Sequence, residues 1–227
     1  MKYRTLLFDA DGTLLDFHRT EAEALISTFS QYQIPLTPEV RQLYEEINRG
    51  LWAAFERGEI DRSTVVDTRF QILFDRLGIP ADGKQFEDDY QEKLGQGAFL
   101  VEGAKEICAE LSADFDLYIV TNGVSRTQYS RLNASGLTPY LKGIFVSEDT
   151  GCQKPMKEFF DYVFAHIEGA DPASTLIIGD SLTSDIQGGL NAGIDTCWYN
   201  PEGLPAPPEY PINYEIRRLS QLRQCCL

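Results

Sequence analysis

Five short runs of apolar and β-branched residues recur along the chain, and polar residues follow most of them. The runs span residues 3–8, 117–121, 144–146, 176–178 and 196–199. Continuous apolar runs of this length, bounded by polar residues, are typical of buried strands. Amphipathic helical segments separate the later runs, and this alternation is typical of parallel sheets. The pattern therefore predicts an α/β fold, a doubly wound parallel sheet of the Rossmann-like type.

Between Leu15 and about Gly97 the strand-like runs give way to helical periodicity. Thr20 with Glu23 resembles a capping box, and Thr37-Pro38 is a favourable helix start. Apolar residues spaced three or four apart form one-sided stripes, as expected for helices packed on a small core. The stripes are Ala22/Leu25/Ile26/Phe29, Val40/Leu43/Tyr44/Ile47, Val66/Phe70/Leu73/Leu77 and Phe86/Tyr90/Leu94.

This change in periodicity predicts two domains. We expect an α/β core domain formed by residues 1–15 and 98–227, and a helical cap domain of residues 16–97 inserted into it. An insertion directly after the first strand is well placed to act as a lid, with hinges near 15–18 and 94–99. Closing such a lid would exclude water and supply substrate contacts.

Composition and charge narrow the classes of partner. The net charge of −15, without a Lys/Arg cluster, argues against a nucleic acid polymer. No apolar stretch approaches the ~18 residues of a membrane span. The first strand begins too early to leave room for a signal peptide. A small phosphorylated metabolite is compatible with this charge as a partner, because a bound divalent cation and one lysine can reverse the local sign. Five cysteines without regular spacing fit a reducing compartment, so we expect a cytoplasmic protein. We also expect a monomer or homodimer.

Four polar stations follow the predicted strands or occupy the loops after them. They are Asp9/Asp11, Thr121-Asn122, Lys154 and Asp180 with Asp185. In doubly wound sheets, ligands bind outside the carboxyl ends of the strands. Taken singly, an aspartate after a strand is often a helix cap and a lysine is often a solvated surface residue. We favour catalysis because all four stations agree with one mechanism.

In this order, the stations resemble the active-site motifs of the haloacid dehalogenase (HAD) superfamily of phosphotransferases, and the match covers the whole chain. The resemblance implies that Asp9 attacks phosphorus and forms an aspartyl-phosphate. Asp11 would protonate the leaving ester oxygen and then take a proton from the hydrolytic water. An aspartate of ordinary pKa, ~3.9, is already ionised at neutral pH, so the nucleophile needs no base. The implied phosphoryl-binding groups are Thr121, Asn122, Gly123 and Lys154.

Magnesium is the cofactor that the resemblance implies, with manganese as the alternative. The implied ligands are the carboxylates of Asp9 and Asp180 and the backbone carbonyl of Asp11. Asp185 would lie behind them and orient water or Lys154. Mg²⁺ takes hard oxygen ligands and usually keeps several waters. A divalent cation also explains how so acidic a protein could accept a phosphate ester.

The second aspartate narrows the chemistry. A departing halide needs no protonation, and dehalogenases lack an acid at this position, so Asp11 favours phosphate esters. The chain also resembles the pyrimidine 5′-nucleotidase branch of the superfamily, whose members hydrolyse nucleoside 5′-monophosphates such as dUMP, dTMP and UMP. The motifs that carry this resemblance are Asn48…Leu51-Trp52, Gly58-Glu59-Ile60, Thr121-Asn122-Gly123, Ser147-Glu148, Gly151…Lys154-Pro155, Ser184–Gly189 and Cys197–Asn200.

Three residues are candidates for contact with a nucleobase. Phe17 and Trp52 would offer a flat aromatic surface, and Asn48 a polar contact. Aromatic residues at helical spacing more often belong to a core, so this assignment has a structural alternative.

Other functions fit the same stations. A phosphatase of sugar phosphates or phosphoglycolate would use the same core. A phosphomutase would retain the aspartyl-phosphate until a second hydroxyl accepts it. A phospho-acceptor module without enzymatic activity also uses an aspartate on a parallel sheet. Asp11 and the helical insert argue against the last of these, because a stable phospho-aspartate should not carry its own hydrolytic base.

Overall fold

The computed structural model describes residues 2–226 and divides the chain into two compact units. One unit, the core, comprises Met1–Phe17 and Ala98–Leu227, and the other, the cap, comprises His18–Gly97. Each unit has its own buried interior. Among residues 2–226, no helix is long and apolar enough to cross a membrane.

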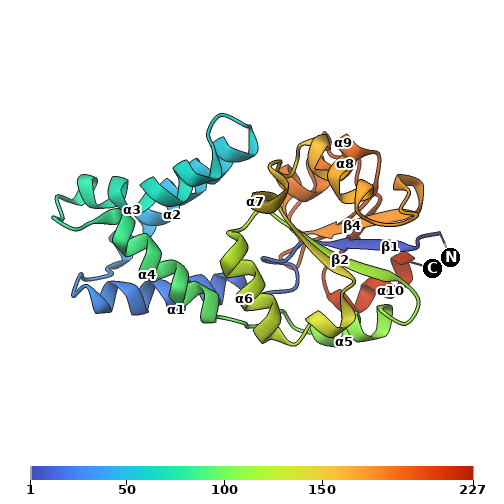
Figure 1. The fold of residues 1–227 in the computed structure, drawn as a ribbon, viewed down its shortest axis with the longest axis horizontal. Helices are drawn as coiled ribbons and strands as arrows, with labels where there is room; N and C mark the ends of the chain where they lie inside the picture. The colour runs from blue at the N-terminus through green and yellow to red at the C-terminus, as the bar shows by residue number, and fades with distance from the viewer. Residues whose placement is uncertain (1, 227) are drawn as a thin grey trace. The chain divides into compact units, whose positions relative to one another are not determined.

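The core is built on a six-stranded sheet in which every strand pairing is parallel (Figure 1). The strand order is β3-β2-β1-β4-β5-β6. The strands are β1 Thr5–Phe8, β2 Asp116–Thr121, β3 Gly143–Val146, β4 Thr175–Gly179, β5 Asp195–Tyr199 and β6 Tyr214–Ile216. The predicted doubly wound α/β fold is confirmed, and the five predicted runs are β1 to β5. The sequence did not predict β6, which has three residues at the edge of the sheet.

Helices cover both faces of the sheet (Figure 1). The longer ones are α5 Ala104–Leu111, α6 Ser125–Ser135 and α8 Lys157–Ala165, and the shorter ones are α7 Ser147–Thr150, α9 Gln187–Ala192 and α10 Leu222–Cys226. Single turns lie at Thr138–Tyr140, Pro172–Ser174, Leu182–Ile186 and Leu219–Gln221.

Alternation along β1 explains why both faces need cover. Successive side chains of a strand point to opposite faces. Leu6 and Phe8 belong to the cluster that includes residues of α5 and α10, whereas Leu7 packs with residues of α8. The central strand is therefore buried on both sides, and its carboxyl end is held rigidly.

The cap consists of four helices: α1 Phe17–Gln31, α2 Pro38–Glu56, α3 Arg62–Leu77 and α4 Gly83–Gln96. The predicted helix start at Thr37-Pro38 is confirmed. The Thr37 hydroxyl accepts a hydrogen bond from Val40 N at the start of α2, and Gly78 ends α3 with φ of 64°. The expected capping box at Thr20 is wrong, because α1 begins at Phe17 and Thr20 is buried inside the helix.

Candidate active site

Asp9 directly follows β1, at the point where the strand order reverses between β1 and β4. Its backbone N–H donates to the carbonyl of Ile178 at 2.8 Å, which extends the ladder between the two strands by one residue. Asp9 is buried. Burial raises the pKa of its carboxyl group; the Lys154 charge opposes this shift, and the neighbouring carboxylates reinforce it. In the protein alone, Asp9 is thus harder to ionise than an exposed aspartate.

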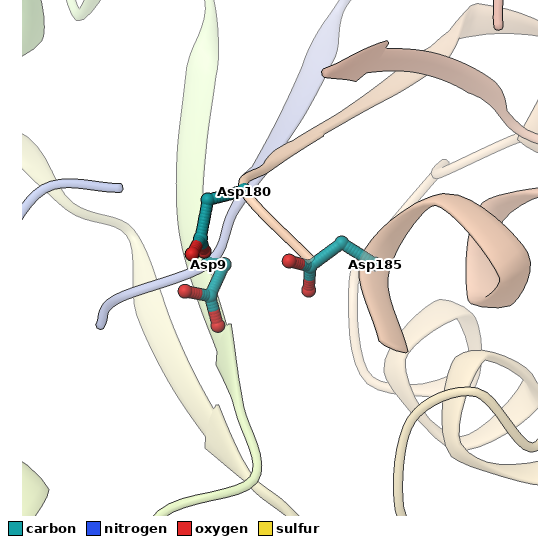
Figure 2. A group of neighbouring side chains, drawn as sticks. All are labelled: Asp9, Asp180 and Asp185. Atoms are coloured by element: carbon teal, nitrogen blue, oxygen red, sulfur yellow. The ribbon is translucent and has the colours of Figure 1, made fainter. Parts of the chain in front are cut away.

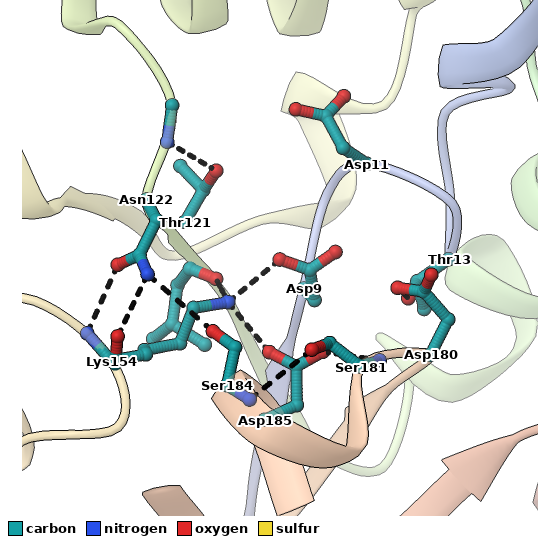
Figure 3. Close-up of polar contacts among 12 residues, drawn as sticks. Asp9, Asp11, Thr13, Thr121, Asn122, Lys154, Asp180, Ser181, Ser184 and Asp185 are labelled. Atoms are coloured by element: carbon teal, nitrogen blue, oxygen red, sulfur yellow. Dashed lines mark hydrogen bonds and ion pairs between the residues drawn. The ribbon is translucent and has the colours of Figure 1, made fainter. Parts of the chain in front are cut away.

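The Lys154 ammonium group connects the parts of the site (Figure 3). It donates at 2.7 Å to Asp9 Oδ1, to Asp185 Oδ1 and to the carbonyl of Val120. Burial by itself would lower the pKa of this lysine, but the carboxylates of Asp185 and Asp9 outweigh that effect and the pKa is raised. Three acceptors match the three donors of an ammonium group. Lys154 is therefore held charged and fixed beside Asp9.

Asp185 is buried, and both of its oxygens have partners. Oδ1 accepts from Lys154, and Oδ2 accepts from the backbone N–H of Ser181 at 3.1 Å. The Ser181 hydroxyl in turn accepts from Ser184 N at 3.1 Å, which fixes the turn Leu182–Ile186 that carries Asp185. The contacts of Asp185 thus suit a residue that holds the lysine in place.

Asp180, after β4, lies against the chain that follows Asp11. Thr13 Oγ1 donates to Asp180 Oδ1 at 3.2 Å, and Trp198 Nε1 donates to the Asp180 carbonyl at 2.9 Å. A side chain at Gly12 would bring its Cβ to 2.5 Å from Asp180 Oδ2, and Gly12 has φ of 83°. Loss of hydration and the Asp185 charge raise the pKa of Asp180 to about 7. Gly12 thus provides both the turn and the space that Asp180 needs.

Three carboxylates converge at these strand ends (Figure 2). One oxygen from each of Asp9, Asp180 and Asp185 lies within 4.8 Å of the other two. A single ammonium group, that of Lys154, pairs with two of the three. This set has an excess of negative charge and hard oxygen donors, which suits Mg²⁺. Since Lys154 and Ser181 engage both oxygens of Asp185, Asp9 and Asp180 are the better placed to bind a cation directly.

Thr121 ends β2, and its hydroxyl oxygen accepts two hydrogen bonds. Gln128 Nε2 donates to it at 2.6 Å, and the backbone N–H of Gly123 donates at 3.2 Å. A hydroxyl group has two lone pairs and one hydrogen. With both lone pairs occupied, the Thr121 hydroxyl is set to donate its hydrogen to a further acceptor, such as a phosphoryl oxygen.

Asn122 makes a different set of contacts from the one expected of a phosphoryl ligand. Its amide nitrogen donates to the Lys154 carbonyl at 2.8 Å, and its amide oxygen accepts from Lys154 N at 3.0 Å. Nδ2 also reaches Ser184 Oγ at 3.4 Å. Asn122 therefore fixes the backbone that carries Lys154 (Figure 3). Its predicted contact with the phosphoryl group stays a prediction.

The side chain of Asp11 is bound by two residues of α6. Gln128 Nε2 donates to Asp11 Oδ2 at 2.8 Å, and Arg131 pairs with Oδ1. Neither Gln128 nor Arg131 was predicted from the sequence, and neither were Thr13 and Ser184 as site residues. One sequence signal could have indicated this pair. Gln128 and Arg131 are polar residues three positions apart, and they follow soon after the Thr121-Asn122-Gly123 segment.

The three candidates for nucleobase contact have different surroundings. Phe17 lies 5.5 Å from the Arg131 guanidinium group and packs on it. In the cap, Asn48 Oδ1 accepts from Arg69 Nη1 at 2.9 Å, which ties it to a buried polar network. Trp52 is half-buried and makes an edge contact with Phe55. Trp52 and Phe55 both belong to α2, so this aromatic contact lies within one helix.

The model of the haloacid dehalogenase-like hydrolase family matches residues 3–193, and the chain belongs to this family. The predicted family and enzyme class, a phosphoric monoester hydrolase, are confirmed.

Three relatives indicate where in the family the chain lies. The HAD-hydrolase YfnB of Bacillus subtilis (strain 168) is 54% identical, over 97% of this chain and 94% of its own length. The pyrimidine 5′-nucleotidase PynA of Streptococcus pneumoniae is 39% identical (99% and 95% covered), and the pyrimidine 5′-nucleotidase YjjG of Escherichia coli is 30% identical (99% and 98%). The predicted resemblance to this branch is confirmed.

A crystal structure of YfnB bound to magnesium is similar in fold. Its TM-score is 0.94 at 53% identity, with 100% of this chain and 99% of that chain covered.

Proposed function

We propose that this protein is a magnesium-dependent phosphatase that hydrolyses pyrimidine nucleoside 5′-monophosphates through an aspartyl-phosphate on Asp9. One observation carries the proposal: the buried Lys154 ammonium group contacts Asp9 Oδ1 at 2.7 Å within the cluster that also contains Asp180 and Asp185. The relatives PynA and YjjG are named pyrimidine 5′-nucleotidases, which supports pyrimidine nucleotides as the class of substrate.

In the first step, an Asp9 oxygen attacks phosphorus, and the bond from phosphorus to the 5′ oxygen breaks. Asp11 gives its proton to that oxygen, so the nucleoside leaves as a neutral alcohol. Lys154 and the Thr121 hydroxyl offset the charge on the phosphoryl oxygens, because donors fixed in advance need no reorganisation. The rigid placement of Lys154 by three acceptors suits it to this role.

In the second step, water attacks the phosphorus of the aspartyl-phosphate. Asp11 takes a proton from the water, the bond between Asp9 and phosphorus breaks, and inorganic phosphate leaves. Both aspartates then have their starting protonation states. Asp9 and Asp180 would hold the magnesium, together with the backbone carbonyl of Asp11, and the bound cation would offset negative charge on the carboxylates and phosphoryl oxygens.

The test is release of inorganic phosphate from a panel of esters in the presence of MgCl₂ or MnCl₂. The panel contains dUMP, dTMP, UMP, purine nucleotides, sugar phosphates, phosphoglycolate and an aryl phosphate. We expect the pyrimidine nucleotides to have the highest kcat/KM, and the Asp9→Ala variant and EDTA-treated enzyme to be inactive.

Each other outcome has a definite meaning. Preference for a sugar phosphate or phosphoglycolate would contradict the proposed class of substrate and leave the proposed mechanism unchanged. Isomerisation of a sugar phosphate without release of phosphate would indicate a phosphomutase. Full activity of Asp9→Ala would overturn the mechanism itself.

A further inference from the structure

Helix α6 carries two polar residues that are almost completely shielded from solvent. Gln128 is 1% exposed and Arg131 is 0% exposed. Residues three apart on a helix lie on the same face. Burying an amide and a guanidinium group is unfavourable unless both are hydrogen-bonded. Their partners therefore explain why these residues are here.

Both residues bind the Asp11 side chain, and they do so at different oxygens. Gln128 Nε2 donates to Oδ2 at 2.8 Å, while Arg131 Nη1 pairs with Oδ1. Arg131 Nη1 also donates to Gln128 Oε1 at 3.0 Å. Two separate donors on two oxygens restrict rotation of a carboxyl group more than one donor would.

The orientation of the Gln128 amide follows from its neighbours. Arg131 has only donors, so the amide oxygen must face it. The amide nitrogen then faces the other way and donates both to Asp11 and to the Thr121 hydroxyl, at 2.6 Å for the latter. The same amide group thus connects Asp11 to the residue at the end of β2.

Neighbouring residues hold this arrangement in place. A side chain at Gly123 would put its Cβ 2.7 Å from the Gln128 side chain, so only glycine leaves room for it. The Phe17 ring packs on the Arg131 guanidinium group. Gln128 and Arg131 are therefore enclosed from two sides within the core unit.

We propose that Gln128 and Arg131 are positioning residues that fix Asp11 in place for proton transfer and align it with Thr121. The inference rests on the proposed role of Asp11 as the acid that protonates the leaving oxygen. A carboxyl group that first gives and then takes a proton at nearly the same point works best from a fixed position. The alternative is that the pair only anchors α6 to the loop after β1.

The two roles differ in how the reaction responds to the leaving group. An alkoxide such as the 5′ oxygen of a nucleoside needs a proton as it departs, whereas the phenoxide of an activated aryl phosphate does not. Misplacing Asp11 should lower kcat/KM selectively for the alkyl ester, because kcat/KM reports the transfer of the phosphoryl group to Asp9 and not the later hydrolysis that both esters share. Loosening the fold should slow both esters by a similar factor.

The experiment compares kcat and KM for dUMP and for a nitrophenyl phosphate in wild type, Gln128→Met, Arg131→Lys and Arg131→Met. Arg126→Met is the matched control, because Arg126 is an exposed arginine on the same helix. For Gln128→Met and Arg131→Met we expect kcat/KM for dUMP to fall on the order of 100-fold, within the range of general acid catalysis, and for the aryl ester to fall far less. Arg131→Lys should recover part of the loss, since it restores a charged donor.

Equal losses of kcat/KM for both esters, or a kcat/KM for dUMP as high as wild type in Gln128→Met, would overturn the inference. If Arg131→Met does not fold, as judged by circular dichroism, Gln128→Met and Gly123→Ala decide the question, because both disturb the same amide group. Failure of the proposed function is distinguishable in the wild type alone, which would then hydrolyse neither ester, or the aryl phosphate without dUMP.

Discussion

Gly12 shows how a missing side chain shapes the site at the scale of single residues. Its φ of 83° suits glycine, and its position leaves the Asp180 carboxylate room to approach. Gly103 has almost the same φ, 81°, but a Cβ added there would have no neighbouring atom within 4 Å. An alanine at Gly103 would meet only the cost of the left-handed backbone, whereas an alanine at Gly12 would also crowd Asp180. Comparing the two variants therefore separates these effects.

We predict that Gly12→Ala lowers phosphatase activity on the order of 100-fold, because displacing a site group by about 1 Å has effects of that size. Gly103→Ala should lose about 1–2 kcal/mol of stability from the left-handed backbone and keep wild-type turnover. Steady-state kinetics over a series of magnesium concentrations measures both variants. Comparable activity of the two variants would contradict the assignment of Asp180 to the cation.

At the scale of elements, a buried ion pair joins α3 to α4 within the cap. Arg69 Nε and Nη2 each donate to Glu87 at 2.7 Å, and both side chains are at most 3% exposed. Arg69 also contacts Asn48 on α2. The Arg69 guanidinium group thus connects three helices of the cap, α2, α3 and α4.

We predict that Arg69→Met destabilises the cap by about 3–5 kcal/mol, because it leaves the Glu87 carboxylate buried without its partner. The double variant Arg69→Met/Glu87→Met should recover much of this loss. Arg57→Met, which breaks the exposed pair with Glu59, should change little. Urea unfolding followed by circular dichroism gives the free energies, and a small effect of Arg69→Met alone would contradict the prediction.

A second contact between elements joins α10 to β5 through thiol groups. A hydrogen bond from Cys197 lowers the pKa of Cys225 to about 7, against the opposing effect of burial. Burial raises the pKa of Cys108 to about 12, and burial with the Cys225 charge raises that of Cys226 to about 12. Cys225 is half-buried, whereas the other two are buried. Cys225 thus forms a thiolate more readily than Cys108 or Cys226.

We predict that alkylation of Cys225 by iodoacetamide rises steeply through about pH 7 and levels off above it, because the thiolate is the reactive form. Cys108 and Cys226 should stay unmodified in the folded protein over the same range. Tandem mass spectrometry distinguishes the adjacent Cys225 and Cys226, and Cys225→Ser serves as the control. A midpoint near 8.5, the value for a free cysteine, would contradict the prediction.

Elements with a continuous apolar pattern were predictable, and those that depend on distant partners were not. β1 to β5 are apolar enough to be recognised locally, but β6 has three residues that pair only with β5. The start of α1 lies three residues before the expected cap at Thr20. The local sequence pattern did not predict where α1 begins, because that position depends on where the chain passes from the core unit into the cap.

The candidate site shows the same division. Asp9, Asp11, Lys154, Asp180 and Asp185 could be named because strands and their polar ends are visible in the sequence. Gln128 and Arg131 could not, since α6 is rich in polar residues and its buried face has no apolar stripe. Those residues are buried because Asp11, far away in the sequence, supplies the partner.

At the scale of the whole molecule, the net charge of −15 complicates any measurement of magnesium binding. Added salt screens repulsion among like charges and can stabilise the fold without a specific site. A ligand that binds only the folded protein stabilises it by RT ln(1 + [L]/Kd). Screening depends on the ionic strength, whichever cation is added, whereas binding to a specific site depends on which cation is present.

We predict that MgCl₂ raises the unfolding temperature more than NaCl of the same ionic strength, with about 2.7 kcal/mol of stabilisation at 100 times Kd. Asp180→Asn should lose the specific part and keep the response to NaCl. Thermal unfolding followed by circular dichroism measures both. Identical curves in the two salts would argue against a specific cation site in the free enzyme.

The order of strands in the sheet has a consequence for biosynthesis. β1, which Asp9 directly follows, lies between β2 and β4, and β4 is followed by Asp180 and Asp185. A ribosome therefore synthesises Asp9 long before Asp180 and Asp185. Until β4 emerges, β1 lacks one of its two flanking strands. Nascent or prematurely terminated chains that stop before Gly179 should thus be catalytically silent, because they lack both β4 and the two carboxylates that follow it.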